Sequence, residues 1–193
     1  MNLTKQYICD TFWSLLEETP YAKITVTLLV ERCHINRNTF YYHFHNIPDL
    51  LTYSIHKWAT TILHESFDPE EPLNTIDPFI SGILARKRAF LHIYRSAEQE
   101  AFVAQLRKSI AFIHDLYFKR VAEESTMDAE TVDTLTWFYR TASTGVILDW
   151  LEHDMDYDLS ARIHNYNAFL IAISGKNFSE RLAAIGSRTF TDK

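Results

Sequence analysis

Apolar residues recur at intervals of three and four along most of this chain, which is the spacing of one face of an α-helix. The first stretch with this pattern contains Ile8, Phe12, Leu15 and Leu16. Four glycines and five prolines in 193 residues leave few positions that interrupt a helix. No segment alternates like a β-strand over a useful length. We therefore expect an all-α fold.

Caps and breaks divide the chain into helical segments. We expect helices at 4–18, from Thr25 to about 33, at 37–44, and from the cap Asn46 to about 65. The segment 68–72 has two prolines in five residues and predicts a connection. Helical patterns resume at 74–84, 86–95, 97–124, 128–152 and 158–174, and the tail holds at most a short helix around Phe178, Leu182 and Ile185. Two domains are expected, at 1–50 and 51–193.

The cysteines and the apolar runs indicate the compartment. Cys9 and Cys33 are too few for a disulfide framework, which is typical of a reducing environment. The N-terminal residues do not have the pattern of a signal peptide, and no uncharged stretch approaches the roughly 20 residues of a membrane helix. We expect a soluble, cytoplasmic protein with no membrane partner.

The charge balance gives no support to nucleic-acid binding. The formal net charge is −6, and residues 1–50 are close to neutral. A basic patch is the usual footprint of a nucleic-acid-binding protein. Any interaction with DNA must therefore depend on a local arrangement of side chains.

Such an arrangement is present in the three short N-terminal helices, which form a helix-turn-helix pattern. Ile24–Val26, Cys33–Phe44, and Asn46 with Asp49–Leu51 resemble the DNA-binding domain of the TetR family of transcriptional regulators. The match covers about residues 5–52. This resemblance implies a regulator that binds double-stranded operator DNA, with no cofactor, no metal and no enzymatic activity.

The helix 37–44 has an apolar face and two polar stripes. Phe40 and Phe44 lie four residues apart and are expected to be buried together. Arg pairs with guanine and Asn with adenine, whereas hydroxyl groups and helix N-termini suit phosphate. The predicted DNA-binding residues are Thr25, Thr27, Asn36, Arg37, Asn38, Thr39, Tyr41, Tyr42 and His45.

Two positions depart from the family pattern. The family usually has a small residue and Gly in the turn, where this chain has Cys33 and His34. It also tends to place a Lys at the start of the fourth helix, where this chain has Ile47. No Lys or Arg occurs from Asn38 through His56. The alternative to a DNA-binding regulator is therefore a TetR-like co-regulator that binds a protein partner and has weak or no DNA binding.

The helices at 128–152 and 158–174 each carry a continuous apolar seam. They resemble the dimerisation helices of the family, and two copies would form a four-helix bundle. The alternative is ordinary core within one chain. The predicted dimerisation residues are Leu135, Tyr139, Ala142, Val146, Trp150, Ile163, Tyr166 and Leu170. The segment Gly145–Leu151 is similar to a subgroup that includes regulators resembling dihydroxyacetone-kinase operon activators.

Aromatic residues gather in the middle helices, where this family holds small-molecule effectors. The alternative is that they are plain core. The predicted effector-binding residues are Tyr94, Phe102, His114, Tyr117, Phe118 and Trp137. Nothing in the sequence identifies the effector.

An enzyme and a metal site are the remaining alternatives. Residues 153–158 have ligand types for a divalent metal but not the glycine and ligand register of a calcium loop. No phosphate loop or nucleophile elbow occurs. The function we expect is that of a ligand-responsive homodimeric repressor that reads a palindromic operator through helix 37–44.

Overall fold

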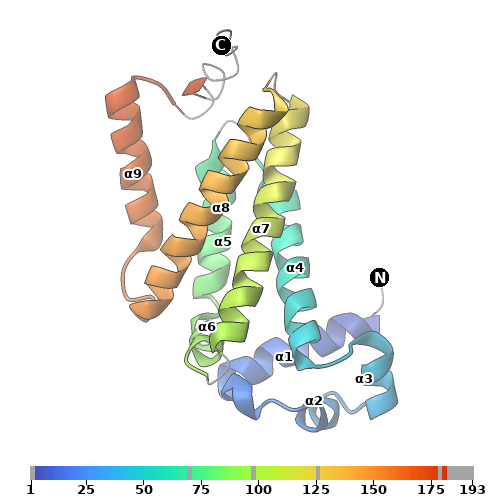
Figure 1. The fold of residues 1–193 in the computed structure, drawn as a ribbon. Coiled ribbons are helices and arrows are strands. Elements are labelled where there is room, and N and C mark those ends of the chain that lie inside the picture. The colour runs from blue at the N-terminus through green and yellow to red at the C-terminus, as the bar shows by residue number, and fades with distance from the viewer. Residues whose placement is uncertain (1–2, 69–70, 97–98, 125–126, 178–179, 182–193) are drawn as a thin grey trace. The chain divides into compact units, whose positions relative to one another are not determined.

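The computed structural model describes residues 3–68, 71–96, 99–124, 127–177 and 180–181. These residues contain α-helices and one short 3-10 helix at Tyr21–Lys23, and no strand occurs among them (Figure 1). The α-helices are α1 (Leu3–Glu18), α2 (Val26–Arg32), α3 (Arg37–His43), α4 (Ile47–Ser66), α5 (Pro72–Leu84), α6 (Lys87–Tyr94), α7 (Gln99–Glu124), α8 (Ala129–Glu152) and α9 (Leu159–Ser174).

The all-α prediction is confirmed, and the helices begin and end within about two residues of the expected positions. Local signals explain this agreement. The side chains of Thr25, Asn36, Asp128 and Asp158 each accept a hydrogen bond from a backbone N–H three residues later, as N-caps do. The short helix expected around Phe178, Leu182 and Ile185 lies outside the described residues.

The chain forms two compact units. The first comprises residues 1–58 and 83–109, and the second comprises 59–82 and 110–193. Helices α4 and α7 each run from one unit into the other, so neither unit is a single continuous segment. The division predicted at residue 50 concerns function, and it stays a prediction.

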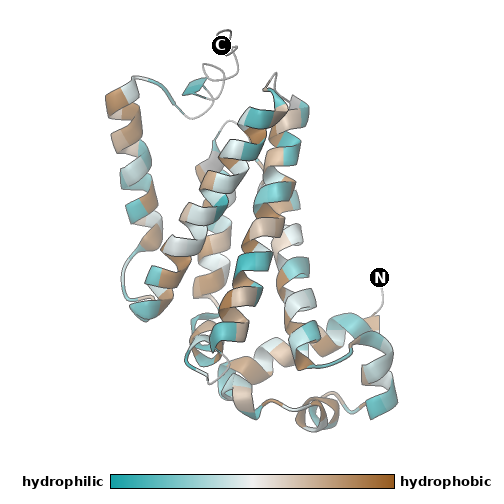
Figure 2. Cartoon of the chain, in the orientation of Figure 1, coloured by the Kyte–Doolittle hydropathy of each residue, from teal (hydrophilic) through white to brown (hydrophobic). Residues whose placement is uncertain are grey.

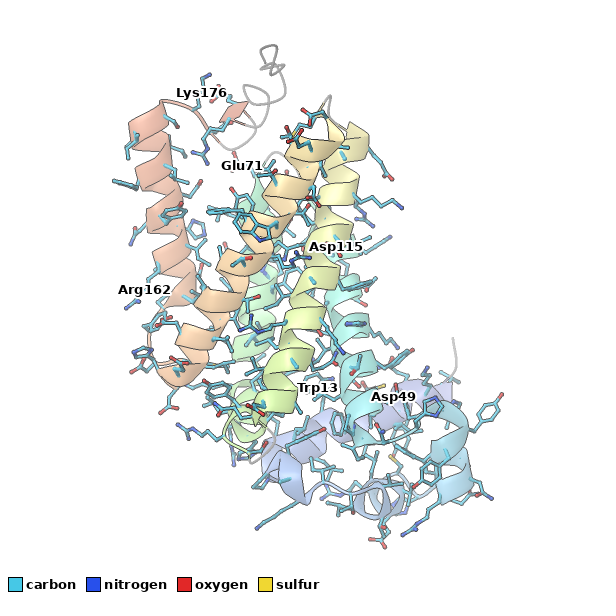
Figure 3. The ribbon with its side chains drawn as sticks, in the orientation of Figure 1. Trp13, Asp49, Glu71, Asp115, Arg162 and Lys176 are labelled. Carbon is cyan, nitrogen blue, oxygen red and sulfur yellow. The ribbon has the colours of Figure 1, made fainter. Side chains whose placement is uncertain are left out.

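The core of the first unit is built on α1. Ile8, Phe12, Leu15 and Leu16 are all buried, as their spacing indicates. Helix α6 packs along α1, where the Trp13 and Phe90 rings lie 5.8 Å apart. Figure 3 labels Trp13 on α1. The His92 ring Nδ1 is 2.8 Å from the Leu16 carbonyl oxygen. Helix α6 therefore belongs structurally with the N-terminal helices.

The core of the second unit lies where α7 and α8 meet the end of α4. The buried cluster consists of Leu63, Tyr117, Phe118 and Val121. Helix α9 is tied to α5 by one carboxylate, because Asp77 accepts a 2.6 Å hydrogen bond from Ser160 and lies 2.8 Å from His164 Nε2. Within the described part of the chain, no helix is long and apolar enough to span a membrane.

Candidate functional site

Helix α3 begins with a closed capping arrangement. The Asn36 side-chain oxygen accepts hydrogen bonds from the Thr39 backbone N–H at 2.8 Å and from the Thr39 hydroxyl at 3.1 Å. Both residues belong to the predicted DNA-binding set, and the structure brings them together. Their contact has a local cause, because an N-cap Asn satisfies backbone donors that the helix leaves unpaired.

The turn before α3 uses a left-handed residue that is not glycine. His34 has φ of 53°. Its backbone N–H donates to the Glu31 oxygen, and the Ile35 N–H donates to the Val30 oxygen at 3.0 Å. This is the hydrogen-bonding pattern that closes a helix C-terminus around a left-handed residue. A side chain there costs more than Gly would.

The exposed and buried faces of α3 separate as the sequence predicts. Phe40 and Phe44 are buried with their ring centroids 5.9 Å apart. Tyr41 is 52% exposed and Tyr42 is 81% exposed. Asn38 is also exposed. A tyrosine with four fifths of its surface in solvent contributes little to the core, so its side chain is available for contact with another molecule.

A direct hydrogen bond joins the second and third helices. Arg37 Nη2 donates to Thr27 Oγ1 at 2.6 Å. Both residues are in the predicted DNA-binding set, and sequence spacing did not reveal that they meet. The Thr25 hydroxyl oxygen, two residues earlier, accepts from the Leu28 N–H at 3.1 Å and begins α2.

The start of α4 is closed by its own polar residues. Asp49 accepts a hydrogen bond from the His45 N–H at 2.9 Å, and its own N–H donates to the Asn46 side chain at 2.8 Å. Figure 3 labels Asp49 in this first turn. The His45 side chain is exposed. These contacts satisfy first-turn donors and place an acidic residue at the helix N-terminus.

Ile47 requires a correction. The family pattern predicts a surface position here, where a Lys would meet phosphate. The Ile47 side chain is only 9% exposed, so this position is buried. Ile47 shares a helix face with Leu50 and Leu51, which are also buried. Because Ile47, Leu50 and Leu51 are three and four residues apart, the sequence already indicated that Ile47 is buried with the two leucines.

Two cations of the first unit contact other side chains of that unit. Lys5 Nζ lies 3.7 Å from the centre of the Tyr53 ring and 5.0 Å from that of Phe44. Arg32 forms a 3.1 Å salt bridge with Glu18. Sequence reasoning missed Lys5, because its aromatic partners come from distant segments.

The predicted effector-binding residues fall into separate groups. Tyr94 and Phe102 are buried in the first unit, with ring centroids 6.4 Å apart. Tyr117 and Phe118 are buried in the second unit. Trp137 is 57% exposed, so it does not share the burial of the other aromatic residues, and its effector role stays a prediction.

His114 links two helices of the second unit. Its Nδ1 is 2.9 Å from the Ile110 oxygen, and its Nε2 is 3.1 Å from the Ser143 hydroxyl on α8. Burial lowers the pKa of His114. The ring therefore joins α7 to α8 in its neutral form at neutral pH.

The predicted dimerisation residues differ in how deeply the structure buries them. Leu135 and Tyr139 pack against the buried cluster of their own chain. Trp150 is fully buried, and its Nε1 donates to the Tyr157 oxygen at 3.0 Å. Trp150 is corrected to core, because a side chain without exposed surface cannot contact a partner. Ile163 and Leu170 are half-buried.

Other apolar residues of α8 and α9 remain exposed. Figure 2 shows apolar positions in the C-terminal half of α9. Ala142, which sequence reasoning included, lies on the exposed side of α8. The large exposed side chains of these two helices are Trp137, Phe138, Val146, Tyr166, Phe169, Ile171 and Ile173. Sequence reasoning missed Phe138, Phe169 and Ile171, because periodicity does not tell which face packs inside the chain.

The loop that joins α8 to α9 has no metal-binding geometry. Asp154 and Met155 have φ of 56° and 52°, and Met155 is buried. Tyr157 donates a hydrogen bond to Asp149 at 2.5 Å, and Arg162 stacks over the Tyr157 ring at 3.8 Å. The described residues contain no group of three or more potential ligands that could hold a metal ion.

Comparisons with known proteins bear on both parts of the chain. A model of the "Bacterial regulatory proteins, tetR family" matches residues 8–53. A second, the "Transcriptional regulator C-terminal region", matches residues 70–171. No curated protein matched the chain.

Solved structures with the same fold are also found. The "Dihydroxyacetone kinase operon activator DhaS" has a TM-score of 0.66 at 15% identity, covering 89% of this chain and 96% of that one. The fatty acid degradation regulator FadR from Bacillus halodurans has a TM-score of 0.60 at 16% identity, over 86% and 93%. A tetR-family transcriptional regulator from Streptomyces coelicolor has 0.57 at 14%, over 98% and 92%. At these identities the likeness shows the fold, and the predicted subgroup stays a prediction.

Proposed function

The chain belongs to the TetR family of transcriptional regulators, and from this premise we propose that it is a homodimeric, effector-responsive repressor that binds palindromic operator DNA through α3. The observation that carries the proposal is the division of α3 into a buried face and an exposed face. Phe40 and Phe44 anchor the helix, while Asn38, Tyr41 and Tyr42 are left on its surface. A short helix presented in this way is the reading element of helix-turn-helix proteins.

Each exposed residue has a distinct role in this proposal. Asn38 is suited to pair with adenine in the major groove. The hydroxyl groups of Tyr41 and Tyr42 are suited to phosphate oxygens. One guanidinium nitrogen of Arg37 already donates a hydrogen bond to the Thr27 hydroxyl. Arg37 can pair with guanine through two nitrogen atoms only if this hydrogen bond is broken. Thr25 caps α2, and in this proposal the N-terminus of that helix faces the DNA backbone.

The homodimer is supported by the exposed apolar residues of α8 and α9. Val146 on α8 and Phe169 on α9 are large apolar side chains that are 39% and 58% exposed among the described residues. Gly145 adds to this support, because a Cβ placed there would meet nothing within 4 Å. A glycine inside a 24-residue helix costs about 1 kcal/mol relative to alanine, and no contact among the described residues requires it. A close-packed partner helix would account for it.

The small-molecule effector and the cytoplasmic location are the remaining parts of the proposal. The family supplies the expectation of an effector, and the buried aromatic residues of α6 and α7 are compatible with one. A repressor acts where the chromosome is, so the chain would act in the cytoplasm.

Selection of operator sequences tests the proposal. The full-length protein is incubated with a randomised duplex pool, and bound sequences are recovered and measured by gel shift. We expect an inverted repeat with half-sites about one helical turn apart. Recovery of sequences without two-fold symmetry would contradict the palindromic operator.

A specific observation favours a second candidate, a co-regulator that binds a protein partner. Arg32 and Arg37 are bonded within the first unit, Lys5 is stacked on aromatic rings, and no Lys or Arg occurs from 38 to 56. Such a surface neutralises few phosphates. If no duplex is recovered at low salt while the protein is folded and dimeric, the co-regulator replaces the repressor.

A further inference from the structure

Helix α7 carries two polar atoms, one turn apart, that are buried and have no hydrogen-bonding partner among the described residues. Ser109 is 1% exposed, and its Oγ has no hydrogen-bonding partner among the described residues. The Nε2 of Gln105 is likewise buried without such a partner. Residues four apart lie on the same side of a helix, so the two groups face the same region.

Ser109 shares this state with Ser54 on α4, whose Oγ is also buried without a hydrogen-bonding partner among the described residues, whereas several other helical hydroxyl groups are paired. A helical Ser or Thr commonly bonds back to the carbonyl oxygen four residues earlier. Ser66 does so at 2.7 Å to Ile62, and Thr144 does so at 2.8 Å to Arg140. Ser109 does not. Buried polar groups almost always have a partner, so an exception points to a molecule that completes the site.

Buried apolar side chains flank the pair on the same helix. Phe102 and Leu106 are buried on the same helix, and the Phe102 ring packs edge-on against Tyr94 at 6.4 Å. Burying an ion in such surroundings without an opposite charge is strongly unfavourable. The Gln105 amide nitrogen only donates hydrogen bonds, whereas the Ser109 hydroxyl donates or accepts.

We propose that Gln105 and Ser109 bind the oxygen-bearing end of a small uncharged ligand, a ketone or alcohol, whose apolar part lies against Phe102. This assignment rests on the effector-responsive function proposed above and gives the effector its chemical class. Gln105 donates to the ligand oxygen, and Ser109 supplies the second hydrogen bond. An ordered water also has an uncharged oxygen and could make the same hydrogen bonds. The experiment must therefore distinguish a bound ligand from a bound water.

Four six-carbon probes test the chemistry on the full-length protein: hexan-2-one, hexan-1-ol, hexanoate and hexylammonium. Binding is measured by calorimetry and by the shift in Tm. We expect the ketone and the alcohol to bind and raise Tm, and the two ions to have no effect. Ser109→Ala and Gln105→Leu should each weaken ketone binding by up to about tenfold, the value of one hydrogen bond.

A matched variant separates the site from general stability. Thr144→Val removes a buried hydroxyl that is already paired, so it should lower Tm without ligand and leave ketone affinity unchanged. Ser109→Ala should hold or raise Tm without ligand, because it removes an unpaired hydroxyl. A fall of several degrees would identify an ordered water as the partner and overturn the proposal.

The remaining outcomes are equally decisive. Absence of ketone and alcohol binding, tighter binding of an ion, or full affinity in both α7 variants would overturn the ligand class. Gel shifts on the same samples, with the selected operator and without probe, report the repressor function separately. Operator binding without probe binding overturns this inference alone, whereas probe binding without operator binding overturns the repressor alone.

Discussion

Arg37 Nη2 and Thr27 Oγ1 are 2.6 Å apart, so the first residue of α3 is hydrogen-bonded to the first turn of α2. This contact holds the two helices of the helix-turn-helix together through an exposed side chain. It also gives Arg37 a role that does not require DNA.

We expect Arg37 and Thr27 to be energetically coupled. Arg37→Ala, Thr27→Val and the double variant form a cycle, and the coupling in the free energy of unfolding should be about 0.5–1.5 kcal/mol. Denaturant titration of the wild type and the three variants measures it. If the two single changes simply add, the hydrogen bond contributes nothing in solution.

Tyr42→Ala should weaken operator binding to all sequences alike, because an 81% exposed tyrosine is placed to meet phosphate. Its effect on the free energy of unfolding should stay within about 0.5 kcal/mol. Asn38→Ala should instead change the preferred base at one position by about 1–3 kcal/mol. Tyr7→Ala, which removes an exposed tyrosine of α1, is the control. Equal operator binding by all four proteins would show that α3 is not the reading helix.

Two lysine variants, at an exposed and a buried position two residues apart, separate phosphate contact from folding. His45→Lys adds a cation at an exposed position and should steepen the slope of log affinity against log salt by about two units per dimer. Ile47→Lys places the same charge at a 9% exposed position and should instead destabilise the fold by about 1–3 kcal/mol. Binding titrations at several salt concentrations and thermal unfolding distinguish the two effects. A steeper slope in Ile47→Lys with unchanged Tm would mean that its side chain faces DNA.

Phe169→Asp and Val146→Asp should convert the protein to monomers, since both side chains are exposed in the single chain and would be buried by a partner. Light scattering at micromolar concentration measures the mass. Leu84→Asp, at a similarly exposed apolar position of α5, should leave assembly unchanged. A wild-type protein that is itself monomeric at this concentration would remove the proposed dimer.

The contact of α5 with α9 should make stability sensitive to acid. Burial raises the pKa of Asp77, but hydrogen bonds from Ser160 and His164 outweigh it, so the net pKa lies below its usual 3.8. A lowered pKa in the folded state stabilises the protein above pH 3.8, and this contribution is lost as pH falls through the lowered value.

Asp77→Asn should therefore lower the free energy of unfolding near pH 7 by no more than about 1 kcal/mol, because the pair is partly exposed. The difference from wild type should shrink below about pH 4. Thermal unfolding between pH 3 and 7 measures it, with the exposed Asp133→Asn as control. A constant difference at every pH would show that the charge of Asp77 has no part in holding α9.

Much of the architecture was determined by the sequence alone. Helix positions, the caps Thr25, Asn36 and Asp158, and the inward face of Phe40 and Phe44 all depend on residues at most four apart, so local spacing contains them. The left-handed residue His34 lies in the turn where the sequence departs from the small residue and Gly that are usual in the family.

The tertiary structure decided which apolar residues of an amphipathic helix are buried within the chain and which stay exposed. Trp150 and Phe138 occupy the same amphipathic helix, yet one is fully buried and the other is exposed. Periodicity cannot separate them, since it reports that a face is apolar and not what covers it. The stacking of Lys5 on Tyr53 and the link of Asp77 to His164 join residues 48 and 87 positions apart. Such pairs arise only when the helices pack, because the energy that selects them comes from contacts between distant segments.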